Sequence, residues 1–248
     1  MLQAHVLDPF IEEGFITELV RPLSSGKEAT LHLCRAGEFA PGHDLVALKV
    51  YRARDRRDFR NTQTYTAGRV VRGRPARAIA TKTRFGREVE EALWQDQEWQ
   101  TLRVLDAVGV AVPRPIVTFG SAILMEYIGD EDGAAPQLKD IAPDPEEAHD
   151  LFAQTMREVE RMLFHNVVHG DLSPFNLLVW EGRVRVIDLP QAVDPRFNPN
   201  AWDLLERDLR TLATWFARHG VELDAPRAAA DLRVGFEFAE LVPPDLRF

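Results

Sequence analysis

The segment VVHGDLSPFNLLV, from Val167 to Val179, interrupts apolar sequence with a compact group of polar side chains. Asp171 and Asn176 lie five residues apart inside it, and the valines and leucines on both sides are typical of buried strands. Asp188 follows twelve residues after Asn176, at the end of the strand-like sequence VRVID. We interpret the segment as a loop whose apolar flanks anchor it to the core.

Two carboxylates and a carboxamide in this order suit phosphoryl transfer. That reaction needs an acceptor for the proton of the attacking hydroxyl and hard oxygen ligands that hold Mg²⁺ on the phosphates. Taken singly, Asp171 and Asn176 could instead make turn hydrogen bonds, and Asp188 could cap a strand end. The combined spacing, followed by a hairpin, favours the catalytic interpretation, in which His169 supports the loop through hydrogen bonds rather than acting as a base.

Lys49 stands inside the otherwise apolar strand pattern LVALKVY. A buried lysine is rare unless it is paired, so Lys49 either points to solvent or reaches an anion. The sequence VALK is close to the V-A-I-K pattern, in which the lysine contacts nucleotide phosphates, and we prefer this interpretation. We expect a glutamate on the following helix as its partner and choose Glu98, with Glu90 and Glu91 as alternatives.

The turn SSGKEA, from Ser24 to Ala29, precedes Lys49 and lies between two predicted strands. Backbone N–H groups in a glycine-containing turn can contact phosphate, and Ser25 and Lys27 could add side-chain donors. The turn matches neither G-x-G-x-x-G nor the Walker A sequence, so by itself it favours an ordinary hairpin turn. Only its position before Lys49 indicates a phosphate contact.

Strand patterns dominate the first half of the chain and helical patterns dominate the second. Strands are predicted at residues 14–23, 29–36 and 44–52 and on both sides of Gly120. Helices are predicted at about 86–108, 145–164, 200–219 and 225–241, with a hairpin at 177–189 that turns at Glu181-Gly182. We therefore expect an α+β fold with two lobes, residues 10–125 and 126–248, and a ligand cleft.

Composition limits the class of protein. With 248 residues, of which 45 % are hydrophobic, the chain can build a sizeable core. Cys34 is the only cysteine, which excludes an internal disulfide and favours a reducing compartment. No apolar run approaches the roughly 18 residues of a membrane helix, and no secretory signal pattern is visible. We expect a cytoplasmic protein without a membrane partner.

Charge is distributed unevenly along the chain, whose net charge is −9. Residues 50–87 are strongly basic, whereas 127–137 and 141–150 are acidic. Glycine and proline interrupt the basic stretch, and we interpret residues 52–87 as a flexible loop. Its partner could be ATP, an acidic protein segment or RNA, and a solvated surface without any partner is an equally good interpretation of the charges alone.

The motifs SSGKEA, VALKVY, ILMEYIGDEDGAAPQL, HGDLSPFN and VIDLPQAV, in this order, resemble those of the RIO kinases. These are atypical serine/threonine protein kinases with a reduced bilobal fold. The resemblance extends from about Phe15 to the last predicted helices. It implies an α+β protein-kinase-like fold, with a small strand-rich N-lobe and a mainly helical C-lobe, and the use of ATP with Mg²⁺ or Mn²⁺.

The resemblance also implies a role for each candidate residue. Asp171 would be the catalytic aspartate, and Asn176 and Asp188 would bind the metal ion. Asp188 could additionally accept the phosphoryl group as an aspartyl-phosphate, which would make the protein an ATPase. The residues that would contact or support ATP are Ser25, Lys27, Lys49, Glu98 and the backbone of Glu126 and Ile128.

The chain departs from the family pattern at two places and in its length. Pro174 stands where the family usually has glutamate, and Leu189-Pro190 precede Gln191 where a small or hydroxyl residue is usual. We expect neither an N-terminal winged helix nor a long C-terminal tail, as in a short, bacterial-like form. The substrate is then a protein of unknown identity or the chain itself, and an RNA or ribosome-related partner remains an open expectation for the basic loop.

Two other functions agree with the same residues. A small-molecule phosphotransferase of the aminoglycoside or choline kinase kind shares the HGD-x-x-x-x-N pattern. A nucleotide-gated binding module without catalysis would also use these residues to hold ATP. The turn SSGKEA and the basic loop favour the RIO interpretation over the first alternative.

Overall fold

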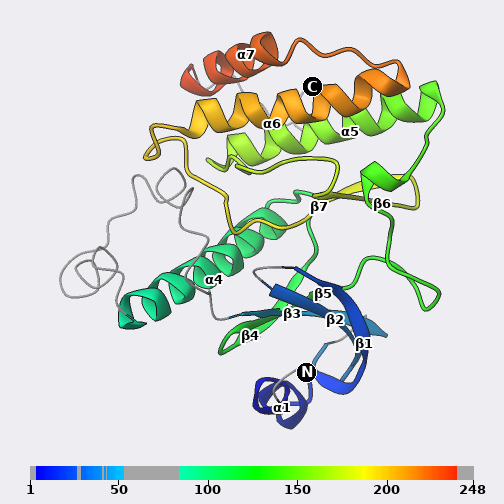
Figure 1. Ribbon diagram of the computed structural model, residues 1–248, viewed down its shortest axis with the longest axis vertical. Helices are drawn as coiled ribbons and strands as arrows, with labels where there is room; N and C mark the ends of the chain where they lie inside the picture. Colours follow the sequence, from blue (N-terminus) through cyan, green and yellow to red (C-terminus); the bar gives the residue numbers. More distant parts are fainter. Residues whose placement is uncertain (1–3, 27–28, 41, 43, 53–83, 239–248) are drawn as a thin grey trace. The chain divides into compact units, whose positions relative to one another are not determined.

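A computed structural model of the chain describes residues 4–26, 29–40, 42, 44–52 and 84–238 (Figure 1). Lys27 and residues 53–83, which contain most of the predicted basic loop, lie outside this range, so the expectations for them stay predictions. The described residues form two compact units. The first contains residues 4–52, 84–103 and 113–134, and the second contains 104–112 and 135–238.

The first unit is built on a five-stranded antiparallel sheet with the strand order β1-β2-β3-β5-β4. The strands are β1 (Ile16–Ser25), β2 (Ala29–Ala36), β3 (Leu45–Tyr51), β4 (Pro115–Phe119) and β5 (Ala122–Glu126). The predicted strands are confirmed. Strand β1 contains Pro22, which the sheet tolerates because β1 is an edge strand and because its register shifts beside this residue.

Helix α1 (Ala4–Glu12) packs against this sheet and has no counterpart in the sequence-based prediction. Pro9 lies inside the helix, and an internal proline removes a backbone hydrogen bond and usually breaks a helix. Burial compensates here, because Phe10 is fully buried and its ring meets that of Phe119 edge to face at a centroid distance of 4.9 Å. Tertiary packing therefore overrides the local signal.

Helix α4 (Arg84–Ala107) begins two residues before the predicted start. Its first part belongs to the first unit, where the amide of Gln95 donates to the carbonyl of Gly120 in the β4–β5 turn and to the hydroxyl of Thr118. These bonds fix the helix against the strand pair. Glu98 lies three residues after Gln95 on the same helix.

The second unit contains a helical layer and a short hairpin. Its elements are η1 (Leu138–Asp140), α5 (Pro145–Phe164), β6 (Leu177–Trp180), β7 (Arg183–Val186), α6 (Ala201–Phe216), η2 (Ala217–His219) and α7 (Ala225–Glu237). Helix α5 has the predicted bounds, because Asp144 caps its first N–H groups and Pro145 suits the first helical position. The hairpin turns at Glu181-Gly182 as predicted, with both residues at positive φ.

Apolar faces of α5 and α6 form the core of the second unit, and α7 lies along α6 (Figure 1). Phe152 and Phe216 meet edge to face at a centroid distance of 5.2 Å. The buried side chains of α6 are Ala201, Leu204, Leu205, Asp208, Leu209, Leu212, Trp215 and Phe216. One carboxylate, that of Asp208, therefore lies among these apolar residues.

A short segment after α4, residues 109–112, also belongs to the second unit. The N–H of Ala111 donates to the carboxylate of Glu158 at 2.9 Å, and its carbonyl accepts from the N–H of Val186 at 2.7 Å. Glu158 is buried and pairs with Arg161 at 3.0 Å. Helix α5 and strand β7 thus hold this segment from both sides.

Taken together, the described residues contain five α-helices and seven strands, which confirms the predicted α+β class. None of the described helices is long and apolar enough to cross a membrane. Cys34 is buried in the sheet, and its burial raises the pKa of the thiol to about 12. This thiol is therefore unsuited to nucleophilic chemistry near neutral pH.

Candidate active site

The described candidate residues fall into two groups, one in each unit. In the first unit, Nζ of Lys49 donates to both carboxylate oxygens of Glu98, at 2.7 and 2.9 Å. The side chain of Glu98 is 2 % exposed and that of Lys49 is 14 % exposed. The pairing that the sequence predicts is therefore present, and it fixes the lysine in a largely desolvated place.

Burial makes each member of this pair depend on the other. A buried charge without a partner is costly, whereas a two-point contact with good geometry offsets much of the cost of desolvation. Strand β3 supplies Lys49 from the middle of the sheet, opposite Leu31 and Ile123 on the neighbouring strands. An ammonium group held in this way is oriented and can contribute to binding an anion.

Ser25 is the last residue of β1, at the start of the SSGKEA turn. The guanidinium of Arg52 donates to the hydroxyls of Ser25 and Thr30, and the N–H of Gly26 donates to the carbonyl of Ala29 at 2.9 Å. Arg52, the first arginine of the predicted basic loop, thus brings positive charge to this turn. The sequence does not indicate this contact, because Arg52 lies 27 positions after Ser25 in the chain.

Glu126 is the last residue of β5, and Ile128 lies two residues later, in the acidic stretch 127–137. The N–H of Glu126 donates to the carbonyl of Arg114 at 2.8 Å, and its carboxylate accepts from the N–H of Arg114 at 3.1 Å. Ile128 is buried. The strand-like bond to Arg114 therefore occupies the N–H of Glu126.

In the second unit, the HGD loop (residues 169–176, HGDLSPFN) is joined to the end of β7 by a closed cycle of hydrogen bonds. The N–H of Asp171 donates to Nδ1 of His169 at 3.3 Å, and Nε2 of His169 donates to the carbonyl of Ile187 at 3.1 Å. The N–H of Ile187 donates to the carbonyl of Asn176 at 3.0 Å. Nδ2 of Asn176 closes the cycle by donating to the carbonyl of Asp171 at 2.8 Å.

The polar residues of the loop make different hydrogen bonds in this cycle. His169 is buried, and its two bonds place the proton on Nε2, which agrees with the supporting role expected for it. Asn176 uses its amide nitrogen toward Asp171, so its amide oxygen is the atom that could bind a cation. Because the cycle includes Ile187, it also fixes the backbone immediately before Asp188.

Asp188 has a left-handed backbone, with φ of 66°. Aspartate and asparagine tolerate this region better than most other residues, because their short polar side chains can bond locally. The residue is exposed. The cycle and this backbone together present one carboxylate at the end of β7 and another, that of Asp171, on the HGD loop.

The second unit offers oxygen donors of the kind that Mg²⁺ prefers. Asp188 supplies a carboxylate and Asn176 an amide oxygen, and Mg²⁺ usually completes its shell with water and substrate phosphate oxygens. Within the described part of the chain, no three His, Cys, Asp or Glu side chains gather closely enough to hold a metal ion by themselves. Two oxygen donors of this kind fit a metal ion that takes its other ligands from water and phosphate.

The two departures from the family pattern lie in well-packed places. The carbonyl of Pro174 accepts from the N–H of Lys139 at 3.2 Å, and that of the next residue, Phe175, accepts from the amide of Gln137 at 2.8 Å. Leu189 is fully buried. Backbone hydrogen bonds thus hold the chain at Pro174 and Phe175, and apolar packing holds it at Leu189.

Sequence reasoning missed two residues of α6 that contact the HGD loop. The guanidinium of Arg207 donates to the carbonyl of Gly170 and lies 3.3 Å from Oδ1 of Asp208 and 4.0 Å from Oδ1 of Asp171. Asp208 is buried on the apolar face of the helix, four residues after Leu204. An aspartate on the otherwise apolar face of a predicted helix is the sequence signal that could have revealed Arg207 and Asp208.

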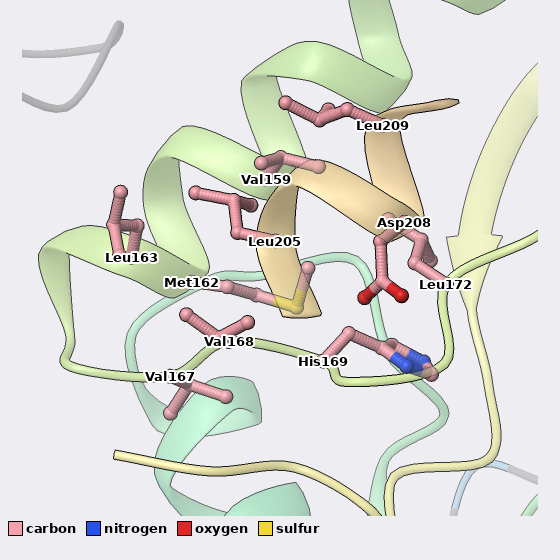
Figure 2. Close-up of a pocket in the computed structure, with 10 residues that line it drawn as sticks. All are labelled: Val159, Met162, Leu163, Val167, Val168, His169, Leu172, Leu205, Asp208 and Leu209. Carbon is pink, nitrogen blue, oxygen red and sulfur yellow. The ribbon is translucent and has the colours of Figure 1, made fainter. Parts of the chain in front are cut away.

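A small pocket of about 10 Å³ lies beside these residues within the second unit (Figure 2). Figure 2 shows the carboxylate of Asp208 and the ring of His169 among the aliphatic side chains that form its wall. Its volume is close to the minimum for a single water molecule. The pocket is therefore too small for a nucleotide and instead marks the packing of α5 and α6 against the HGD loop.

Burial raises the pKa of Asp208 to about 7. The neighbouring carboxylate of Asp171 acts in the same direction, whereas a backbone hydrogen bond from Leu172 and the charge of Arg207 lower the pKa. Near neutral pH the carboxyl group therefore exists in both its protonated and ionised forms.

We predict that Asp208 makes the protein less stable as the pH rises from about 4 to about 7. In this window the folded state binds more protons than the unfolded state, because the folded pKa of about 7 exceeds the ordinary value of 3.8. Asp208→Asn removes this titration and keeps an acceptor oxygen. Between about pH 5 and about pH 8, the wild type should lose about 3 kcal/mol more unfolding free energy than the variant. Urea unfolding at both pH values tests this, and parallel pH dependences would contradict it.

Comparison with known proteins identifies the family. The family model described as the RIO domain matches residues 35–228, which is more than half of the chain. The chain belongs to the RIO family. Its two units accordingly represent the bilobal, protein-kinase-like α+β fold of the RIO domain, with the strand-rich and the mainly helical parts that the sequence predicts.

Relatives of this RIO-domain chain occur in archaea and eukaryotes. It is 32 % identical to the RIO-type serine/threonine-protein kinase Rio1 of Haloferax volcanii over 86 % of this chain and 68 % of the relative. For Rio1 of Thermoplasma acidophilum the identity is 37 % over 58 % of this chain and 74 % of the relative. The human serine/threonine-protein kinase RIO1 is 28 % identical over 94 % of this chain but only 38 % of its own length.

Proposed function

We propose that this protein is an ATP- and Mg²⁺-dependent RIO-type serine/threonine kinase that can also act as an ATPase. The observation that carries the proposal is the hydrogen-bond cycle of His169, Asp171, Asn176 and Ile187, which joins the proposed proton acceptor to the residues proposed for the metal. The names of the relatives support kinase activity. Kinases in general use ATP with a divalent metal ion.

The residues of the first unit would bind ATP. Lys49, oriented by Glu98, would contact the phosphates, and Ser25 and Lys27 would add donors from the turn. Because the N–H of Glu126 is already bonded to Arg114, Glu126 would offer adenine its carbonyl and Ile128 its N–H. Mg²⁺ or Mn²⁺ bound to Asn176 and Asp188 would neutralise negative charge on the phosphates.

Asp171 would accept the proton of the substrate hydroxyl. The hydroxyl oxygen forms a bond to the γ-phosphorus while the bond from that phosphorus to the β–γ bridging oxygen breaks, and ADP leaves. The exposed position of the Asp171 carboxylate, of which 53 % is accessible, suits contact with a macromolecular substrate. A protein side chain or a serine or threonine of the same chain could serve as the acceptor.

The ATPase branch would use Asp188 as the acceptor. A carboxylate oxygen of Asp188 would attack the γ-phosphorus, giving an aspartyl-phosphate and ADP, and water would then release inorganic phosphate. The left-handed backbone of Asp188 and its exposure support such a role, since both present the carboxylate outside the core. In this branch the phosphorylation state of Asp188 would serve as a switch.

The basic segment, residues 52–87, is proposed to contact an anionic macromolecule. Of its arginines, Arg52 has a described side chain, which lies at the phosphate-binding turn proposed above, and Arg84 and Arg87 belong to the first turn of α4. A protein substrate with acidic character and an RNA or ribosome-related partner are both compatible with this charge. Such contacts should weaken as the salt concentration rises.

A single labelling experiment tests the proposed function. The purified protein is incubated with γ-labelled ATP and Mg²⁺, and free phosphate, labelled protein and label transferred to a cell extract are measured separately. We expect acid-stable label on serine or threonine, and hydroxylamine-sensitive label if Asp188 is phosphorylated. The Asp171→Asn variant lacks the proposed proton acceptor and serves as the negative control for the acid-stable label.

Each alternative predicts a different outcome of this experiment. Label in a small molecule such as an aminoglycoside or choline, without labelled protein, would favour the small-molecule phosphotransferase. Saturable ATP binding without turnover in any fraction would favour a nucleotide-gated binding module. Either result would contradict the kinase proposal.

A further inference from the structure

One arginine of α6 contacts the HGD loop at the residue before the proposed proton acceptor. Nη2 of Arg207 donates to the carbonyl of Gly170 and also lies 3.3 Å from Oδ1 of Asp208. The same nitrogen is 4.0 Å from Oδ1 of Asp171. A single guanidinium group therefore holds the backbone beside Asp171 and places a positive charge next to its carboxylate.

The backbone of Gly170 is adapted to this contact. Its φ of 78° lies in the left-handed region, which glycine adopts without the strain that a side chain would add. The carbonyl that Arg207 holds thus belongs to a residue with a left-handed backbone. Any loosening of the contact would free the peptide that leads directly into Asp171.

Helix α6 also holds the other side of Asp171. The backbone N–H of Leu172, the residue that follows Asp171, also acts on the carboxylate of Asp208 and lowers its pKa. Arg207 and Asp208 are adjacent in sequence and interact with each other, so one helical turn contacts the peptides on both sides of Asp171. The HGD loop is held from its own side by His169 and Asn176 and from α6 by this pair.

A purely structural role would not require this pair. Asp208 is 2 % exposed among leucines, and an apolar residue at a buried ionic position is often as stable or more stable. Arg207, by contrast, has a side chain that is 46 % exposed, so its removal creates no cavity in the core. A buried carboxylate with a perturbed pKa beside a proposed acceptor is typical of a functional position.

We propose that Arg207 is a positioning residue for phosphoryl transfer, which keeps the carboxylate of Asp171 where it accepts the hydroxyl proton. The inference rests on the proposed function, since it takes Asp171 as that acceptor. Arg207 acts through Asp171 and not on ATP, so its loss should lower kcat and leave KM for ATP nearly unchanged. A misplacement of about 1 Å at a reacting group costs roughly 100-fold in rate.

The test compares Arg207→Met, Arg207→Lys and a control, Arg210→Met. Arg210 lies on the same helix, is more exposed, and its guanidinium pairs with Glu206. With labelled ATP, Arg207→Met should lower kcat about 100-fold with KM for ATP within about threefold of the wild type. The kcat of Arg207→Lys should be at least tenfold higher than that of Arg207→Met, because lysine keeps the positive charge. Arg210→Met should match the wild type.

A second readout does not depend on activity. Amide hydrogen exchange at Gly170, Asp171 and Leu172 should accelerate at least tenfold in Arg207→Met and stay unchanged in Arg210→Met, while exchange in the α5 core stays slow. If the wild type has no turnover, the proposed function fails, and this exchange result still decides whether Arg207 holds the loop.

Three outcomes would overturn the proposal. A rise in KM for ATP with normal kcat would make Arg207 a nucleotide-binding residue. A loss of kcat together with faster exchange throughout α5 and α6 would make it a residue of general stability. Unchanged kcat and unchanged exchange at residues 170–172 would show that the contact has no consequence for Asp171.

Discussion

Lys49→Met should lower kcat/KM for ATP by about 100- to 1,000-fold, because a charge-assisted contact is lost where negative charge must be stabilised. The same substitution leaves the carboxylate of Glu98, which is 2 % exposed, without its lysine. Breaking a buried pair from one side costs about 3–5 kcal/mol of stability. Labelled-ATP turnover and urea unfolding should therefore both change.

A double variant separates these two effects. Lys49→Met with Glu98→Gln removes the uncompensated charge, so the unfolding free energy should return most of the way to the wild-type value. Catalysis should stay low, because no cation replaces Lys49 at the phosphates. Recovery of turnover together with stability would show that Lys49 matters only as a partner for Glu98. In that case the VALK sequence would have no connection with phosphate binding.

Asp188→Asn is expected to abolish ATP turnover and every hydroxylamine-sensitive phosphorylated form of the protein. The substitution removes the carboxylate that is proposed both to bind the metal ion and to accept the phosphoryl group in the ATPase branch. The fold should survive, because Asp188 is exposed and asparagine also tolerates its φ of 66°. Phosphate release and acid–urea gel analysis measure the two chemical outcomes, and circular dichroism measures the fold.

Two matched variants sharpen this test. Asp203→Asn changes another exposed aspartate of the second unit, on the first turn of α6, and should leave turnover unchanged. Asp188→Glu keeps the carboxylate but puts a longer side chain on a left-handed backbone, which costs about 1–2 kcal/mol. Normal turnover in Asp188→Asn would remove this residue from the mechanism.

Local sequence signals predicted most of the fold. Helix α5 has the predicted bounds because its capping aspartate, first-turn proline and apolar periodicity agree with one another. The β6–β7 hairpin was equally clear from Glu181-Gly182. Helix α1 was missed because Pro9 opposes a helix locally, and only the burial of Phe10 against the sheet outweighs it.

The candidate site was predictable where residue type and spacing act together. Lys49 with Glu98 could be chosen from the strand pattern and the following helix, and this ion pair is present. Arg207 and Asp208 were not predicted, since their importance comes from contacts with a loop that lies 37 residues earlier in the chain. Such contacts depend on how α6 packs against the HGD loop, and no local sequence pattern predicts that packing.

The bonds of Ala111 to Glu158 and Val186 have a consequence for any attempt to divide the protein into fragments. Residues 104–112 lie between two stretches of the first unit but belong to the second, so no single cut separates the units. A fragment that ends at residue 134 would expose Val110 and Val112, which are buried in the whole protein. A fragment that begins at 135 would leave the carboxylate of Glu158 without the N–H that it accepts from Ala111. Neither half is thus a self-contained piece of chain, and the smallest part that can be expected to fold cleanly includes both units.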